Sequence, residues 1–179
     1  MKNIPEEIHN FDINEMPDHP GKSFTVDVLR MCKKVIVVAV ENFSGFVITS
    51  FSKSEKSEDL YETIYQAVYP FKSGATVKMR VDQAPGFRKL FSQKNLKSND
   101  ILLELGEAKN ANSLAICDRK MQELQKEMKK ISPSGNVVDV QILSKATNMV
   151  NEKIRNQGLS AKEILFSRDQ FLQKKSRFA

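Results

Sequence analysis

Two aspartates separated by thirty-five residues mark the stretch that decides the fold. It reads VDQAPGFRKL from Val81 to Leu90 and LELGEAKNANSLAICDRKMQELQKE from Leu103 to Glu127. Asp82 closes a run in which apolar and polar residues alternate, which is typical of a half-buried strand. Asp118 stands at the polar border of an apolar stripe with helical spacing, formed by Cys117, Met121, Leu124, Met128 and Ile131. We therefore expect Asp82 at a strand end and Asp118 near a helix start.

A third aspartate, Asp27, lies upstream in the strand-like run FTVDVLRM, just before the apolar run from Val35 to Val40. A carboxylate flanked by two valines is costly to bury without a cation, which favours a functional role over a buried partner or a sheet edge. Asp82 by itself could merely cap the helix that follows it. Asp118 by itself would be a solvated helix residue in most proteins. Together, at this spacing, the three predict one carboxylate cluster.

The aspartates and their surroundings resemble the catalytic core of retroviral and long-terminal-repeat retrotransposon integrases, which carry Asp, Asp and then an acidic residue at the spacing found here. RVDQAPGF, AKNANSLAICDRKMQELQKEM and VNEKIRNQGLSAKEILFSRDQ all look like transposon polyprotein integrase sequence. The resemblance covers roughly Pro17 to Gln170. One departure matters, because the third acidic position is normally Glu in the family and is Asp118 here.

The resemblance implies phosphodiester chemistry with two divalent ions, Mg²⁺ or Mn²⁺. Asp27 would bridge both ions, with Asp82 completing one site and Asp118 the other. Hard cations of this kind prefer carboxylate oxygens, and Mg²⁺ keeps several waters and takes substrate phosphate oxygens, so few protein ligands suffice. The implied activity is that of a polynucleotidyl transferase, which trims the 3′ ends of element DNA and joins them to target DNA. The shorter side chain of Asp118 implies impaired activity.

Two other function classes stay open. One is an integrase-derived protein that binds DNA or another partner with weak catalysis or none, which the substitution at Asp118 favours. The other is a ribonuclease H-like metal nuclease, which would need another acid near the site and usually a His. The sequence shows no well-placed candidate for either.

The order of expected elements is that of the ribonuclease H-like fold, an α/β fold with a mixed five-stranded sheet flanked by helices. Short gaps between the first three strands predict antiparallel hairpins, and a helix before the fourth predicts a parallel crossover. The expected strands are residues 24–31, 34–40, 45–51, 76–82 and 101–105. Between them we expect a helix capped by Ser54 or Ser57 and ending near Pro70, and a short helix over 84–93.

The rest of the chain is expected to be helical. After the helix of Asp118, which should break at residues 132–135, a second helix is predicted over Val140 to Asn156. A third should begin at Ser160, because Glu163 completes a capping-box pattern. We divide the chain into an extended lead-in (1–22), a catalytic core (23–135) and a C-terminal helical extension with a basic tail (136–179).

The charge pattern suits a polyanionic partner. The formal net charge is +6, but residues 1–22 carry a local charge of −3, which leaves +9 for the rest. Polar groups near Asp118 are predicted to position DNA through its phosphates, with an ordinary solvated helix face as the less favoured alternative for any single residue. The candidates are Lys109, Asn110 and Asn112 in the preceding loop, and Arg119, Gln122, Lys126 and Lys130 along one helical strip.

Composition bounds the remaining properties. No apolar run approaches a membrane span and no signal peptide is evident, so we expect a soluble, intracellular protein without a membrane partner. We also expect a nuclear location. Cys32 and Cys117 fall in apolar strand and helix patterns and are expected to be free thiols. His9 and His19, without paired cysteines, are expected to be linker residues rather than zinc ligands. The resemblance implies association, and Phe71, Phe87, Phe91 and the helix from Val140 to Ile154 offer more apolar surface than a small domain readily hides, which predicts a homodimer or higher oligomer.

Overall fold

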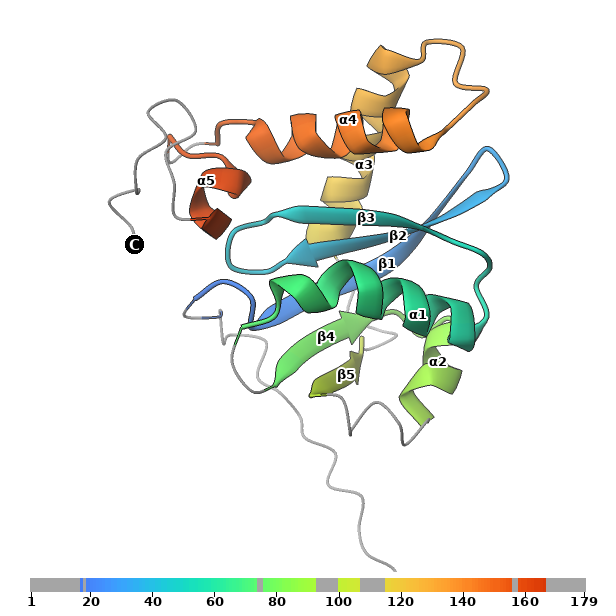
Figure 1. Ribbon diagram of the computed structural model, residues 1–179, viewed down its shortest axis with the longest axis vertical. Helices are drawn as coiled ribbons and strands as arrows, with labels where there is room; N and C mark the ends of the chain where they lie inside the picture. The colour runs from blue at the N-terminus through green and yellow to red at the C-terminus, as the bar shows by residue number, and fades with distance from the viewer. Residues whose placement is uncertain are drawn as a thin grey trace, which may run out of the picture.

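The computed structural model describes residues 17, 19–73, 76–92, 100–106, 115–155 and 158–166 (Figure 1). Three strands come first, followed by alternating helices and strands and then by three helices. In chain order these elements are β1 (Ser23–Met31), β2 (Lys34–Glu41), β3 (Val47–Ser52), α1 (Ser57–Val68), the short 3₁₀ helix η1 (Tyr69–Phe71), β4 (Val77–Val81), α2 (Pro85–Ser92), β5 (Ile101–Leu105), α3 (Ala115–Ile131), α4 (Val140–Glu152) and α5 (Ala161–Phe166). The order of strands and helices is the predicted one.

The five strands form one mixed sheet in the order β3-β2-β1-β4-β5. The first three pair antiparallel through short connections, and β4 lies parallel to both β1 and β5. The parallel pairing follows because α1 carries the chain back across the sheet before β4 begins. The predicted mixed five-stranded sheet flanked by helices is therefore confirmed.

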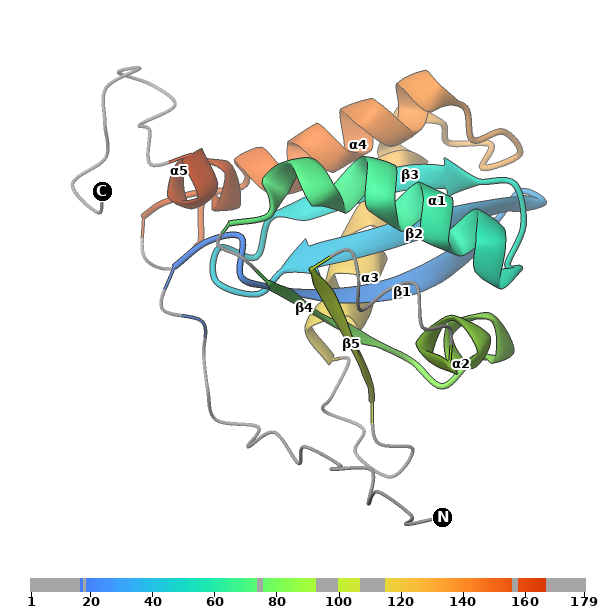
Figure 2. The same ribbon diagram turned by 60° about the horizontal axis from the view of Figure 1, so that its bottom comes forward.

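Helices cover both faces of the sheet, α1 and α2 on one side and α3 and α4 on the other (Figure 2). Side chains of strand β2 pack into the core on both faces of the sheet, as its unbroken apolar run predicts. Val37 and Ala39 belong to the core beneath α1, whereas Ile36, Val38 and Val40 belong to the core beneath α3 and α4. The sheet is thus a rigid platform with a packed layer on each face.

The turn between β1 and β2 corrects one expectation about Cys32. This residue lies in the two-residue turn rather than in a strand, and both Cys32 (φ 51°) and Lys33 (φ 59°) have positive φ. Two positive φ angles are characteristic of a type I′ hairpin, whose twist matches that of the flanking strands. The Cys32 thiol donates a hydrogen bond to the carbonyl oxygen of Gly135 at 3.0 Å. Both cysteines are free, as predicted.

The helix ends differ from the sequence prediction in two places. Helix α1 has Lys56 as its N-cap, without a side-chain cap, so the prediction of Ser54 or Ser57 is wrong. The Ser54 hydroxyl instead accepts a hydrogen bond from the Lys56 N–H at 3.1 Å. Helix α4 ends at Glu152, four residues before the predicted end. The capping box before α5 is confirmed, since the Ser160 and Glu163 side chains bond each other's backbone N–H at 3.2 and 2.6 Å.

A buried amide side chain fixes α4 to the edge strand β3. Asn151 accepts a hydrogen bond from the Val47 N–H at 2.7 Å and donates to its carbonyl oxygen at 2.8 Å. These bonds satisfy an edge position of the sheet that would otherwise be buried without a partner. Because α4 also packs on α3, they help to hold α3, and with it Asp118, against the sheet. None of the helices among the described residues combines the length and apolar character needed to cross a membrane.

Candidate active site

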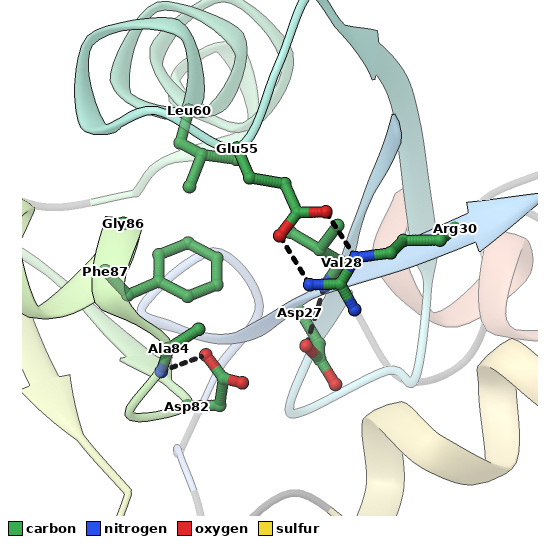
Figure 3. A pocket seen from close by; sticks show the side chains of 9 residues that line it. All are labelled: Asp27, Val28, Arg30, Glu55, Leu60, Asp82, Ala84, Gly86 and Phe87. Atoms are coloured by element: carbon green, nitrogen blue, oxygen red, sulfur yellow. Dashed lines mark hydrogen bonds and ion pairs between the residues drawn. The ribbon is translucent and has the colours of Figure 1, made fainter. Parts of the chain in front are cut away.

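Asp27 and Asp82 lie side by side where the parallel pairing of β1 and β4 ends. The ladder runs from Ser23 opposite Lys78 to Val26 opposite Val81, and the aspartates are the residues that follow this last pair, Asp27 within β1 and Asp82 directly after β4. Beyond this point β1 continues to Met31 with β2 as its partner. The carboxyl ends of parallel strands are where α/β sheets commonly bind ligands. Figure 3 shows the two carboxylates facing the same pocket.

Asp82 orders the turn before α2 and also lines the pocket. One carboxylate oxygen accepts a hydrogen bond from the Ala84 N–H at 3.0 Å, directly before α2 begins at Pro85. That bond orders the turn into the helix, as Asp side chains commonly do. The other oxygen points toward Asp27 in Figure 3. Ordering the turn therefore does not remove Asp82 from the pocket.

Asp118 lies in the first turn of α3, which begins at Ala115. Its neighbour Cys117 is fully buried against the sheet, with its thiol 3.7 Å from the carbonyl oxygen of Val38. Asp118 itself is exposed, and it does not line the pocket that contains Asp27 and Asp82. In the described part of the chain, no three His, Cys, Asp or Glu side chains are close enough together to hold a metal ion. The third aspartate approaches the pair without completing a ligand set.

Burial, and to a smaller extent the neighbouring carboxylates, raise the pKa of Asp27. Burial is the largest cause that raises the pKa of Asp27 from 3.8 to about 6. A hydrogen bond from the Val28 N–H, at 2.7 Å, opposes this rise. The charges of Asp82 and Asp118 raise the pKa further, and that of Arg30 lowers it. A nearby cation would therefore stabilise the ionised form of Asp27.

The donor set at this position suits a hard divalent cation. Carboxylate oxygens are the ligands that Mg²⁺ prefers, and Mg²⁺ typically uses one or two of them together with waters and substrate phosphate oxygens. Asp27 and Asp82 provide that number from two adjacent strands. The pair therefore fits such an ion, with Asp118 as a third carboxylate that is near enough to influence Asp27.

The pocket contains two charged residues that the sequence patterns do not predict there. Arg30 and Glu55 line it together with Asp27 and Asp82, and Arg30 donates from Nε and Nη2 to the two carboxylate oxygens of Glu55. The expectation that no further acid lies near the site is therefore wrong. Neither residue belongs to a motif, and their pairing brings together positions 25 residues apart, so local periodicity carries no signal for it.

Gly86 explains why the loop of Glu55 lies so close to α2. A Cβ at Gly86 would collide with the carbonyl oxygen of Glu55 and lie 2.9 Å from Cδ1 of Leu60. The absence of a side chain therefore lets the start of α2 approach the segment that leads into α1. This contact sets the positions of Asp82, which precedes α2, and Glu55, which precedes α1.

The residues predicted to contact DNA are only partly described. Arg119, Gln122, Lys126 and Lys130 are all exposed on α3. Lys130 differs from the others because its Nζ lies 2.8 Å from a carboxylate oxygen of the buried Glu127. Lys109, Asn110 and Asn112 lie outside the described residues.

Comparison with solved structures decides the fold. A chain of the simian T-cell lymphotropic virus intasome, solved in complex with PP2A regulatory subunit B56 gamma, superposes with a TM-score of 0.71 at 17% identity. That match covers 87% of this chain and 58% of the other. The HTLV-2 integrase catalytic core domain, in complex with magnesium, has a TM-score of 0.66 at 20% identity over 82% of this chain and 97% of that one. This chain has the fold of a retroviral integrase catalytic core.

A third structure extends the same conclusion. The catalytic core domain of BIV integrase has a TM-score of 0.64 at 24% identity, covering 82% of this chain and 94% of that one. The integrase-core fold confirms the ribonuclease H-like architecture expected from the sequence. No family model matches the sequence, and neither does any curated protein. The chain spans 58% of the length of the intasome chain but nearly all of the two isolated core domains.

Proposed function

We propose that this chain is the catalytic core of an integrase-type polynucleotidyl transferase, which processes the 3′ ends of element DNA and joins them to target DNA. The observation that carries the proposal is the adjacent pair Asp27 and Asp82, one residue beyond the ladder that joins β1 to β4. Asp118 approaches the pair from α3 and contributes to the raised pKa of Asp27. Paired carboxylates at the end of a sheet suit metal-assisted phosphodiester chemistry.

Asp27 and Asp82 would hold Mg²⁺ or Mn²⁺, with Asp27 shared between two ions and Asp118 the third ligand. Bound there, the ions would activate the attacking oxygen and stabilise the leaving oxygen. The protein's own contribution is positioning. The ladder fixes Asp27 relative to Asp82, and the Ala84 N–H fixes one oxygen of Asp82. The related HTLV-2 core was solved with magnesium, which supports the choice of ion.

The shorter third acid is expected to limit the rate. Asp118 is exposed and does not line the pocket, so its carboxylate must move toward Asp27 before it can complete a site. This observation also favours a second candidate function, an integrase-derived protein that binds DNA with weak catalysis or none. A third candidate is a ribonuclease H-like metal nuclease, which would need a further acid as a metal ligand. Glu55 lines the pocket, but both of its oxygens accept from Arg30, which disfavours this candidate.

The partners follow from charge and from the related structures. DNA is the proposed ligand because the chain beyond residue 22 has a net charge of +9. We also propose a homodimer or higher oligomer, since HTLV-2 cores were solved in dimeric and trimeric forms. The exposed side chains of Phe91 on α2 and of Val140 and Met149 on α4 support it, whereas Phe87 is fully buried and does not contribute, contrary to the sequence prediction. Sedimentation showing only monomer at tens of micromolar would count against association.

The same proposal includes an origin in a retrotransposon polyprotein, an endonuclease step and a nuclear location. It also includes the division of the chain into a lead-in (1–22), a catalytic core (23–135) and a C-terminal extension (136–179).

A strand-transfer assay separates the three candidates. Purified protein is incubated with blunt and branched DNA in Mn²⁺, with and without EDTA. Joined products that need the metal, and that vanish in Asp27→Asn and Asp82→Asn, support the integrase function. Asp100→Asn is the matched control. Asp100 directly precedes β5, at the end of the parallel strands opposite to Asp82, and it has a positive φ that Asn tolerates. DNA binding without products supports the second candidate, and cleavage of an RNA–DNA hybrid without joining supports the third.

A further inference from the structure

One side chain that lines the acidic pocket carries a positive charge. Of the nine residues that line it in the described part of the chain, Arg30 is the one with a positive charge, against the carboxylates of Asp27, Glu55 and Asp82. Figure 3 shows its guanidinium between Glu55 and Asp27. A phosphate that enters this pocket meets repulsion from three carboxylates and attraction from Arg30.

The guanidinium of Arg30 is fixed from both ends. Its backbone belongs to β1 and pairs with Val35 of β2. Its Nε and Nη2 donate to the two oxygens of Glu55, whose loop is held against α2 by the close approach of Gly86. A two-pronged pair of this kind fixes the guanidinium plane, so less rotational freedom is lost when a ligand binds.

The ion pair of Arg30 and Glu55 leaves guanidinium N–H donors unused and contributes little to the stability of the fold. A guanidinium has five N–H donors, and the bonds to Glu55 use two of them. The side chain of Arg30 is 68% exposed, so a ligand can approach it from solvent. Ion pairs this exposed add little to stability. Guanidinium forks match the spacing of phosphate oxygens, so the free edge is suited to a phosphodiester.

We propose that Arg30 binds a phosphate of the DNA strand that enters the acidic pocket, and that Glu55 is the positioning residue that holds its guanidinium for this contact. The proposal rests on the proposed function in taking DNA as the ligand. Glu55 is a positioning residue rather than a metal ligand, because both of its oxygens accept from Arg30.

Binding of a fluorescent blunt duplex, measured by anisotropy over a series of salt concentrations in magnesium buffer, tests the contact. Arg30→Ala is expected to weaken binding about tenfold and to reduce the slope of log affinity against log salt by roughly 0.9, the value for one lost phosphate contact. Arg30→Lys keeps the charge and the slope and weakens binding severalfold. Glu55→Gln also keeps the slope and weakens binding. Arg30→Gln repeats the test should the Ala variant fold poorly.

The matched control removes a lysine from an exposed ion pair outside the pocket. Lys162 lies 2.8 Å from Glu152 and belongs to α5, which both views place at the opposite end of the sheet from α2. Lys162→Ala is expected to leave affinity and slope unchanged. Wild-type affinity and slope in Arg30→Ala would overturn the phosphate contact. Weaker Mn²⁺ binding by Glu55→Gln, measured by calorimetry, would make Glu55 a metal ligand and overturn its positioning role.

Neutral methylphosphonates placed at single phosphates locate the contact. The wild-type protein should lose affinity at one position near the DNA end, and Arg30→Ala should lose nothing more at that position. Equal losses in both proteins at every position would overturn the proposal. Because the readout is binding, a wild-type protein that binds DNA with this pattern but joins no ends refutes the proposed function alone.

Discussion

Asp27 and Asp82 occupy equivalent positions, because each directly follows the last residue pair between β1 and β4, Val26 opposite Val81. The ladder determines how far apart the two backbones lie, and the rigid sheet holds them there before any ligand binds. Asp118 has no such constraint, because it stands in the first turn of a separate helix. The pair is therefore preorganised, whereas the third acid depends on how α3 packs.

Stability should depend on pH through Asp27. Its pKa is raised from 3.8 to about 6, mainly by burial, with Asp82 and Asp118 adding to the rise and Arg30 opposing it. The folded state then binds more protons than the unfolded state between these values, so stability falls as pH rises from about 4 to about 6. Asp27→Asn should be more stable than the parent by about 1–2 kcal/mol above pH 6, allowing for solvent screening, and equal to it below pH 4.

Urea denaturation of both proteins in EDTA at several pH values measures this difference. Adding Mg²⁺ should stabilise the parent and leave Asp27→Asn unchanged. A difference that does not vary with pH would mean that burial of Asp27 is not what limits stability.

The polar strip of α3 should contribute to DNA binding through charge. Arg119 and Lys126 are exposed, and replacing both with Ala should weaken binding to any duplex and lower the salt slope by roughly 0.9 for each lost contact. Lys130 is better tested separately, because its removal would also deprive the buried Glu127 of an ion-pair partner. Anisotropy titrations over a salt series give the slope, and an unchanged slope would place the DNA surface elsewhere.

Gly86 should tolerate no side chain. Gly86→Ala puts a methyl group against the carbonyl oxygen of Glu55, so either α2 or the loop before α1 must move. We expect a loss of about 1–3 kcal/mol in the free energy of unfolding. Ser92→Ala, exposed on the same helix, should change stability by less than about 0.5 kcal/mol. A Gly86→Ala protein as stable as the parent would show that this approach is not constrained.

The sequence was sufficient to predict the sheet, Asp27 within the first strand and Asp82 at the end of the fourth, because alternating and continuous apolar runs report strands directly. It failed where the chain used unusual local chemistry, as at Cys32 and Lys33, whose type I′ turn contains none of the residues that usually signal one. It also failed for the pair of Arg30 and Glu55, which only the packing of α2 against the loop before α1 brings together.

The third acid should respond to one added methylene. Asp118→Glu extends the side chain by about 1.5 Å, the length of one carbon–carbon bond. Because Mg²⁺ tolerates only small departures from its ligand distances, we expect strand transfer to rise at least about tenfold, equivalent to roughly 1.4 kcal/mol of barrier. Single-turnover strand transfer in Mg²⁺ measures the rate. A fully active parent that Glu slows would mean that α3 already compensates.

The central claim is that Asp27 and Asp82 hold a divalent ion at the end of the β1–β4 ladder. Crystals soaked in Mn²⁺ and measured for anomalous scattering test it most directly, since the signal identifies the ion and its position. We expect a peak shared by the carboxylates of Asp27 and Asp82, and no peak there in crystals of Asp27→Asn. Crystals that diffract well and bind Mn²⁺ elsewhere, with nothing between these two side chains, would contradict the claim.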